Sequence, residues 1–152
     1  MSRFNSSFSK FLAINSLHLL CINGVAAEPT ISQDLSHGWR VARGDNPEWS
    51  RPDFDDRGWQ KIKTNLSWEA QGFENYDGYA WYRLRFIADE KLRLLNGDPY
   101  SEPLRLRLGQ IDDVDQTWFN GVKIGETGEF PETYRPAWRE SRAYKIPKTL
   151  IR

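Results

Sequence analysis

Two segments of the chain alternate apolar and polar residues with a period of two, and this pattern constrains the fold most strongly. In AWYRLRF at 80–86, the even-numbered residues are apolar, whereas Trp81, Arg83 and Arg85 hold the odd positions. In LRLRL at 104–108, three leucines alternate with two arginines. Successive side chains of a β-strand point to opposite faces, so both segments predict half-buried strands. Neither segment fits the helical period of 3.6 residues.

A predicted hairpin follows these strands. Asn120-Gly121 separates the strand-like runs 116–119 and 122–125, and this dipeptide favours a type I′ turn, which requires positive φ at both central positions. Further candidate strands lie at 38–41, 60–62 and 143–146, and a candidate helix at 88–95 is expected to stop at Asn96-Gly97-Asp98-Pro99. Several short strands joined by turn-rich connections predict an all-β sandwich or barrel.

The first 27 residues have the layout of a cleaved secretory signal. Arg3 and Lys10 border a mostly apolar run at 11–22, and small residues at 25–27 offer a cleavage site. We therefore predict a signal peptide at 1–27 and one exported domain at 28–152, periplasmic or extracellular; a buried N-terminal helix and an uncleaved anchor are the alternatives. Cys21 is the only cysteine, so the mature domain would contain no disulfide.

Charge excludes two classes of partner. The segment 28–152 carries 19 basic and 21 acidic residues, which gives no electrostatic attraction to nucleic acid or to an anionic membrane. No stretch of it reaches 18 consecutive apolar residues, so we predict no membrane insertion of the mature chain.

The sequence offers no convincing catalytic group. Beyond the signal, His37 is the only histidine, and no nucleophile elbow, zinc-binding spacing or phosphate-binding loop is present. Asp112, Asp113 and Asp115 cluster after the 104–108 strand. They can shape a turn, hold a structural calcium ion, or perform acid–base chemistry; the first reading is favoured, and no other cofactor or metal is predicted.

A second acidic motif stands at 53–59. Asp55 and Asp56 can cap a tight turn while Trp59 fills the core. The alternative is an acidic pair that faces a sugar.

Four motifs, in this order, resemble the sugar-binding jelly-roll domain of glycoside hydrolase family 2. They are PDFDDRGW at 52–59, DGYAWYR at 77–83, LGQIDDVD at 108–115 with WFNGVKIG at 118–125, and RAYKIP at 142–147. The form of the third motif is similar to that of sialate O-acetylesterases. The resemblance implies a galactose-binding-like jelly-roll β-sandwich. It assigns structural motif roles to a set of residues: Asp55, Asp56, Trp59, Trp81, Arg83, Asp112, Asp113, Asp115, Asn120 and Gly121.

The resemblance also implies one strand more than this sequence supplies. Family members continue after the stretch that matches 146–151 with a turn and a final apolar strand. We therefore expect a domain truncated at its C-terminus that lacks its last strand. A missing strand forgoes the burial of several apolar side chains, so the isolated chain is expected to be unstable.

The functional expectation is a non-catalytic carbohydrate-binding or scaffolding module of an exported glycosidase or sugar esterase. Its partner would be a carbohydrate ligand or a downstream catalytic domain. The alternative is the ligand-sensing ectodomain of a bacterial membrane signalling protein. Sugar recognition needs aromatic faces beside polar groups, and both occur in the connecting loops. The candidate carbohydrate-binding residues are Trp68, Tyr76, Asp77, Tyr134, Arg135 and Trp138, with Asn75 and Arg139 as polar neighbours.

Overall fold

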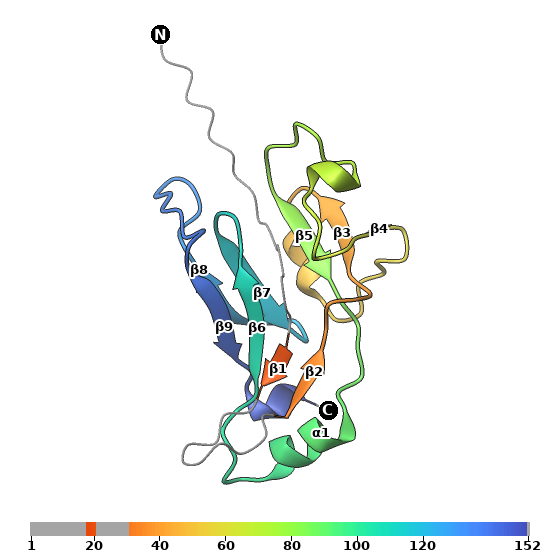
Figure 1. The fold of residues 1–152 in the computed structure, drawn as a ribbon, viewed down its shortest axis with the longest axis vertical. Coiled ribbons are helices and arrows are strands. Elements are labelled where there is room, and N and C mark those ends of the chain that lie inside the picture. The colour runs from red at the N-terminus through yellow and green to blue at the C-terminus, as the bar shows by residue number, and fades with distance from the viewer. Residues whose placement is uncertain (1–17, 21–30, 152) are drawn as a thin grey trace.

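The computed structural model describes residues 18–20 and 31–151, and within them the chain is mostly β with one short α-helix (Figure 1). The β-strands are β1 (His18–Leu20), β2 (Ser32–Asp34), β3 (Arg40–Arg43), β4 (Gln60–Lys61), β5 (Ala80–Arg83), β6 (Arg105–Gln110), β7 (Asp115–Phe119), β8 (Val122–Thr127) and β9 (Ser141–Lys145). The helices are α1 (Glu90–Gly97) and the 3₁₀ turns η1 (Pro47–Ser50), η2 (Glu69–Gln71) and η3 (Lys148–Leu150).

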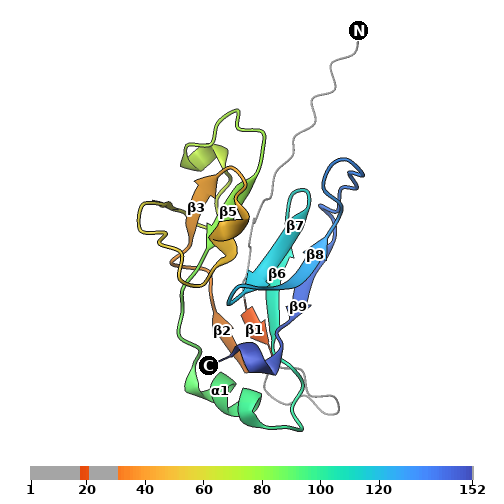
Figure 2. The ribbon, with the colours of Figure 1, turned by 180° about the vertical axis from the view of Figure 1, so that it is seen from behind.

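The strands form three small antiparallel sheets. Their orders are β2-β1-β6-β9, β4-β3-β5 and β7-β8. Figures 1 and 2 show β3 to β5 on one side of the molecule and β6 to β9 on the other, with α1 at one end. The predicted signal peptide lies outside the described residues except for His18–Leu20, whose backbone forms β1 between β2 and β6.

The alternating segments form strands, with altered bounds. The 80–86 segment is a strand only over Ala80–Arg83, and the 104–108 segment becomes β6 and extends to Gln110. The hairpin forms at the predicted dipeptide, with φ of 48° at Asn120 and 82° at Gly121. The helix ends within the predicted tetrapeptide, but its bounds differ from 88–95, because α1 spans Glu90–Gly97 and ends where the Asp98 N–H bonds to the Leu95 carbonyl.

A single apolar core joins the sheets. Val41 of β3, Ala80 of β5 and Leu106 of β6 belong to it, and Leu92 of α1 is fully buried within it. The leucines of the second alternating segment all point inward, so the period of two gives this face correctly. Burial of each large apolar side chain contributes about 1.5–3 kcal/mol, and this shared core packs the sheets against one another.

The opposite face of β5 is also covered. Trp81 is only 7% exposed, and its indole N–H donates to Asp45 at 2.7 Å. Trp49, from η1, packs edge-on against Trp81 with ring centroids 6.3 Å apart and against Trp59 at 5.1 Å. The 45–59 segment therefore covers much of the arginine-bearing side of β5, including Trp81.

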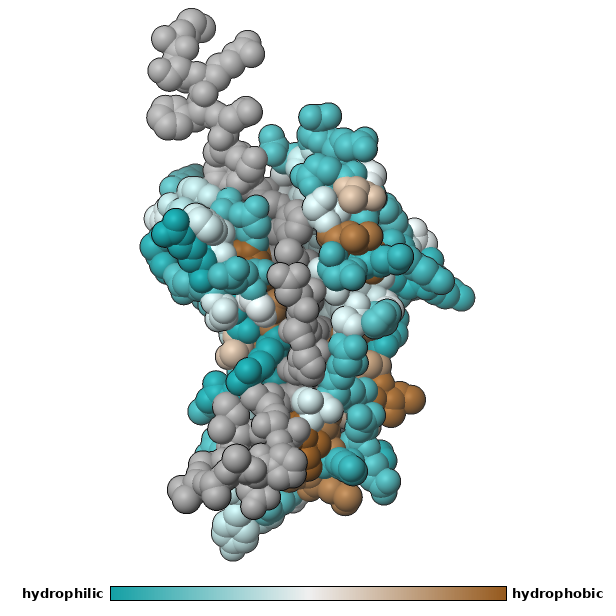
Figure 3. All heavy atoms as spheres, viewed as in Figure 1, coloured by the Kyte–Doolittle hydropathy of each residue, from teal (hydrophilic) through white to brown (hydrophobic). Residues whose placement is uncertain are grey.

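The outer surface is mainly hydrophilic in the view of Figure 3, with apolar residues gathered toward the lower right. Ile87 and Leu94, next to and within α1, are 86% and 68% exposed. Among the described residues no helix is long and apolar enough to cross a bilayer.

Candidate functional site

A buried ion pair organises one end of the molecule. Arg142 of β9 has a fully buried side chain, and its Nε donates to Asp115 of β7 at 2.8 Å. Its remaining nitrogens donate to backbone carbonyls of Ala137 (2.6 Å), Asp113 (3.0 Å) and Glu140. Arg142 thus ties the connection between β6 and β7 to the 128–140 segment, which we call the Tyr134 loop.

Asp115 accepts further bonds inside the same network. The Tyr144 hydroxyl donates to both carboxylate oxygens, at 3.0 and 2.8 Å, and the Thr117 hydroxyl donates at 3.0 Å. Burial raises the pKa of the Asp115 carboxyl, while the bonds from Arg142 and Tyr144 oppose the rise. Both carboxylate oxygens of Asp115 are thus bonded to side chains of the protein, as a structural role requires.

Asp112 and Asp113 lie at the surface end of this network. The Tyr134 hydroxyl donates to Asp113 Oδ2 at 2.7 Å. Burial and the neighbouring Asp113 raise the pKa of the Asp112 carboxyl, and burial beside Asp113 raises the pKa of Tyr134 to about 12. The Asp112 and Asp113 carboxyls and the Tyr134 hydroxyl therefore gather hydrogen-bonding oxygen atoms in one place, which suits a hydroxyl-rich ligand.

The Tyr134 loop carries an aromatic residue that faces solvent. Trp138 is 50% exposed, and the Arg139 guanidinium lies 4.4 Å from its ring centroid. The loop closes on itself through two backbone bonds between Glu129 and Arg135, at 3.0 and 3.1 Å. The Arg135 side chain pairs with Glu129 at 3.1 Å and with Glu140 at 3.9 Å. The loop is thus held by its own bonds, and Trp138 remains available.

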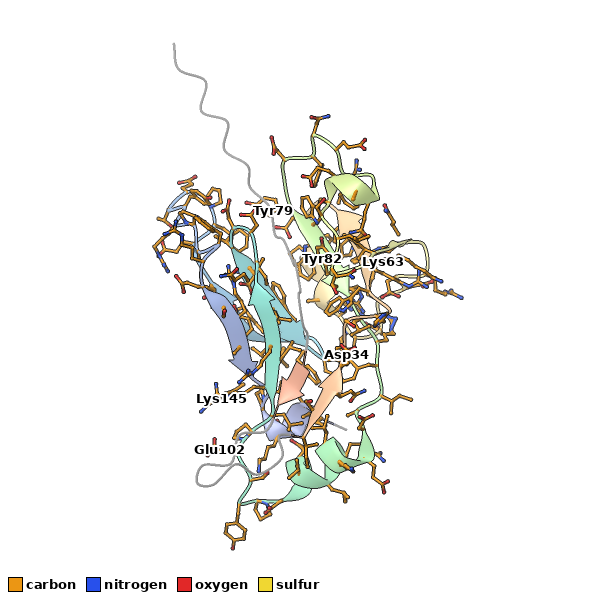
Figure 4. All side chains as sticks on the ribbon, in the orientation of Figure 1. Asp34, Lys63, Tyr79, Tyr82, Glu102 and Lys145 are labelled. Atoms are coloured by element: carbon orange, nitrogen blue, oxygen red, sulfur yellow. The ribbon has the colours of Figure 1, made fainter. Side chains whose placement is uncertain are left out.

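An aromatic contact brings the loop toward the other group of strands. The rings of Tyr79, just before β5, and Phe130, in the Tyr134 loop, have centroids 5.7 Å apart. In Figure 4, Tyr79 lies between the two groups of strands.

The candidate residues near β5 are less suited to bind a ligand than expected. Trp68 is 3% exposed, and it packs against Phe73 and donates to the Tyr82 hydroxyl. Tyr76 is half-buried, and its hydroxyl donates to the Tyr79 carbonyl at 2.6 Å. Both side chains hold the 68–79 connection in place, and only Asp77 of this group is exposed. The burial of Trp68 argues against its predicted role, because a ligand cannot stack on a ring sealed in the core.

The acidic motif at 55–56 binds arginines within the protein. The exposed Asp55 pairs with Arg57 at 2.7 Å and accepts the Arg57 backbone N–H at 3.1 Å. Asp56 is 4% exposed and accepts Arg83 at 3.2 Å and Arg85 at 3.0 Å. Asp56 therefore links the 52–59 motif to the segment around β5, as a structural residue would.

A cleft of about 480 Å³ lies between β5 and β7. Residues 80–86 and 115–121 form its two walls, and Leu106 and Leu108 belong to its lining. Trp118 of β7 stacks on Trp81 across it, with ring centroids 4.7 Å apart and planes inclined by 28°.

Sequence reasoning missed three residues of these sites. Arg142 entered only as part of a resemblance motif, although it is the centre of the buried network. Trp49 and Trp118 were not proposed for the aromatic cluster. The alternation of apolar and polar residues did not indicate that Arg142 is buried, because an arginine in a strand is normally exposed.

The described residues contain no group of three His, Cys, Asp or Glu side chains that could hold a metal ion. His37 lies on a surface turn with its side chain 93% exposed, and its Nδ1 lies 2.7 Å from the Ser36 hydroxyl. Nothing in this arrangement forms a pocket around the imidazole.

No family model matches the chain. A stretch of 92 residues is 34% identical to an NAD(P)H-hydrate epimerase from Cryptococcus neoformans var. neoformans. The match covers 54% of this chain and 36% of that protein. The chain thus spans about a third of the length of this curated relative.

Proposed function

We propose that this chain is a non-catalytic carbohydrate-binding module, folded as a jelly-roll β-sandwich and belonging to an exported enzyme similar to glycoside hydrolase family 2 or to a sugar esterase. The ligand would bind on the Tyr134 loop, at Trp138 with Arg139 beside it and the Asp112–Asp113 pair as polar partners. The proposal rests on the sequence motifs and on this loop, because such folds host many functions and only the site can argue for one.

The observation that carries the proposal is the exposed Trp138 on a loop fixed by a buried network. A half-exposed tryptophan on the surface offers an apolar face to the C–H groups of a sugar. Tyr134, on the same loop, and Asp113, in the connection between β6 and β7, are bonded at 2.7 Å and add polar oxygen atoms. Arg142 anchors the loop through the Ala137 and Glu140 carbonyls, so little ordering is needed when a ligand binds.

Calorimetric titration tests the proposal. The full chain is titrated with methyl β-galactoside, methyl β-glucuronide and a sialoside. We expect binding of at least one sugar in the millimolar range, with Trp138→Ala weakening it about tenfold, or about 1.4 kcal/mol. Tyr100→Ala is the matched control, because Tyr100 is also an exposed aromatic, at 95%, but follows α1 instead of lying on the Tyr134 loop.

If a folded chain binds none of the sugars, the scaffolding role is favoured. If Tyr100→Ala weakens binding as much as Trp138→Ala does, the ligand does not bind on the Tyr134 loop.

A further inference from the structure

The walls of the cleft between β5 and β7 have an unusual composition. Each wall consists of seven consecutive residues, 80–86 on one side and 115–121 on the other. Successive residues of an extended chain point to opposite faces. A cavity bounded by one face of a sheet would be lined by every second residue. Over Ala80–Arg83 and Asp115–Phe119, the parts of the walls that are strands, lining by every residue in turn means that the cleft runs along the edge of the strand.

β5 and β7 each pair with another strand along the edge opposite to the cleft. β5 pairs with β3, from Arg40↔Arg83 to Arg43↔Ala80, and β7 pairs with β8 through the Asn120-Gly121 hairpin. None of the residues of β3 or β8 belongs to the cleft lining. The cleft therefore borders the sides of β5 and β7 that face away from their sheet partners.

The cleft has two chemically different faces. Leu106 and Leu108, both buried, lie in the lining from β6, together with Leu84, which packs on the core. On the opposite face, Trp81 and Trp118 stack on each other. An extended chain in the cleft would need apolar side chains toward the leucines and a small side chain beneath the stacked rings.

Charge at one end of the cleft adds a requirement. Arg83 and Arg85 share the single carboxylate of Asp56, at 3.2 and 3.0 Å, so this cluster keeps one excess positive charge. Arg83 is almost enclosed, whereas the Arg85 side chain is 51% exposed and lines the cleft. Arg85 lies four residues beyond Trp81 and two beyond the end of β5, and its guanidinium bonds to the same Asp56 carboxylate as that of Arg83.

We propose that the cleft binds an extended segment of another polypeptide, which inserts as a β-strand between β5 and β7. Its side chains would alternate, with apolar residues toward Leu106 and Leu108. On the other face it would carry a small residue at the Trp81–Trp118 stack and an acidic residue four positions away, beside Arg85. This is strand addition, in which backbone bonds give affinity and alternate side chains give specificity. The inference does not depend on the sugar-binding proposal, since it uses a different surface.

Synthetic peptides test the inference on the full chain. The peptide Thr-Val-Ser-Val-Thr-Val-Glu-Val-Thr places serine and glutamate four positions apart on one face, and a second peptide reverses their order because the strand direction is open. A matched peptide replaces glutamate by lysine, and another replaces the central threonine by proline, which breaks strand pairing. Tryptophan fluorescence reports binding, and hydrogen exchange of segments 80–86 and 115–121 reports its place.

We expect one of the two glutamate peptides to bind saturably and to slow exchange in both segments. The lysine peptide should bind about fivefold or more weakly, a modest effect because Arg85 is half exposed, and the proline peptide should not bind. In the Arg85→Gln variant the preference for glutamate over lysine should disappear. Arg107→Gln, at an exposed arginine of β6 outside the cleft lining, should leave the preference unchanged.

Three results would overturn the inference. They are the absence of saturable binding by either glutamate peptide, equal binding of the proline peptide, and slowed exchange that lies outside both segments. The sugar titration is read separately, so a failed peptide experiment leaves that proposal standing.

Discussion

Replacement of the buried Arg142 is the most direct test of how this molecule is held together. Arg142→Met keeps much of the side-chain volume but removes the guanidinium. The change leaves the Asp115 carboxylate without its cation and frees the carbonyls of Ala137, Asp113 and Glu140. Breaking one partner of a buried ion pair costs about 3–5 kcal/mol, because the other charge stays desolvated. A domain of this size is stable by about 5–15 kcal/mol in total, so the loss would be a large fraction.

Urea unfolding followed by tryptophan fluorescence measures this cost. Arg135→Met is the control on the same loop, because the Arg135 side chain is 58% exposed and its ion pairs with Glu129 and Glu140 lie at the surface. It should cost less than about 1 kcal/mol. Adding Asp115→Leu to Arg142→Met removes the stranded carboxylate, so the double variant should be more stable than Arg142→Met alone.

The reasoning is refuted if Arg142→Met costs no more than Arg135→Met. It is also refuted if the second substitution lowers the stability of Arg142→Met further by its full single-variant cost.

Two more predictions concern pH and packing. Because burial and Asp113 raise the pKa of Asp112 above its ordinary 3.8, the folded state holds this proton to higher pH than the unfolded chain. The stability that it contributes is therefore present at lower pH and lost as pH rises above about 4. The free energy of unfolding, measured by urea titration at a series of pH values above about 4, should therefore fall less with rising pH in Asp112→Asn than in the wild type. An equal fall in both proteins would contradict the assignment. Gly125→Ala would place a methyl group against the Tyr144 ring, whereas Gly58→Ala meets no atom within 4 Å. The first should cost about 1–3 kcal/mol in a thermal melt and the second much less; equal costs would refute the contact.

Local pattern predicted most of the strands correctly because their signals are short-range. The leucines at 104, 106 and 108 all point into the core, and Asn120-Gly121 takes the positive φ angles that its hairpin needs. The end of α1 lies two residues later than predicted because Asn96 and Gly97 have low intrinsic helix propensity, which tertiary context overrides. Asn96 gains such a context through its side-chain bond to the Lys148 carbonyl at 3.0 Å, far along the chain.

Roles of individual tryptophans could not be predicted in this way. Trp68 and Trp138 both stand in turn-rich connections, yet one is 3% and the other 50% exposed. The difference comes from partners distant in sequence, since Trp68 meets the Tyr82 hydroxyl while Trp138 stacks with its neighbour Arg139. A loop signal identifies where the chain turns, but it does not say which side of the turn the core will cover.

The sequence by itself determined the β-rich character, the main hairpin and the inward face of β6, because alternation and turn chemistry act between near neighbours. Only the tertiary structure decided that Asp56 and Arg142 are buried in ion pairs and that β5 and β7 border a common cleft. Asp56 and Arg142 each form an ion pair with a residue 27 positions away along the chain. No local sequence pattern specifies such long-range contacts, since they depend on how all the segments pack around the core.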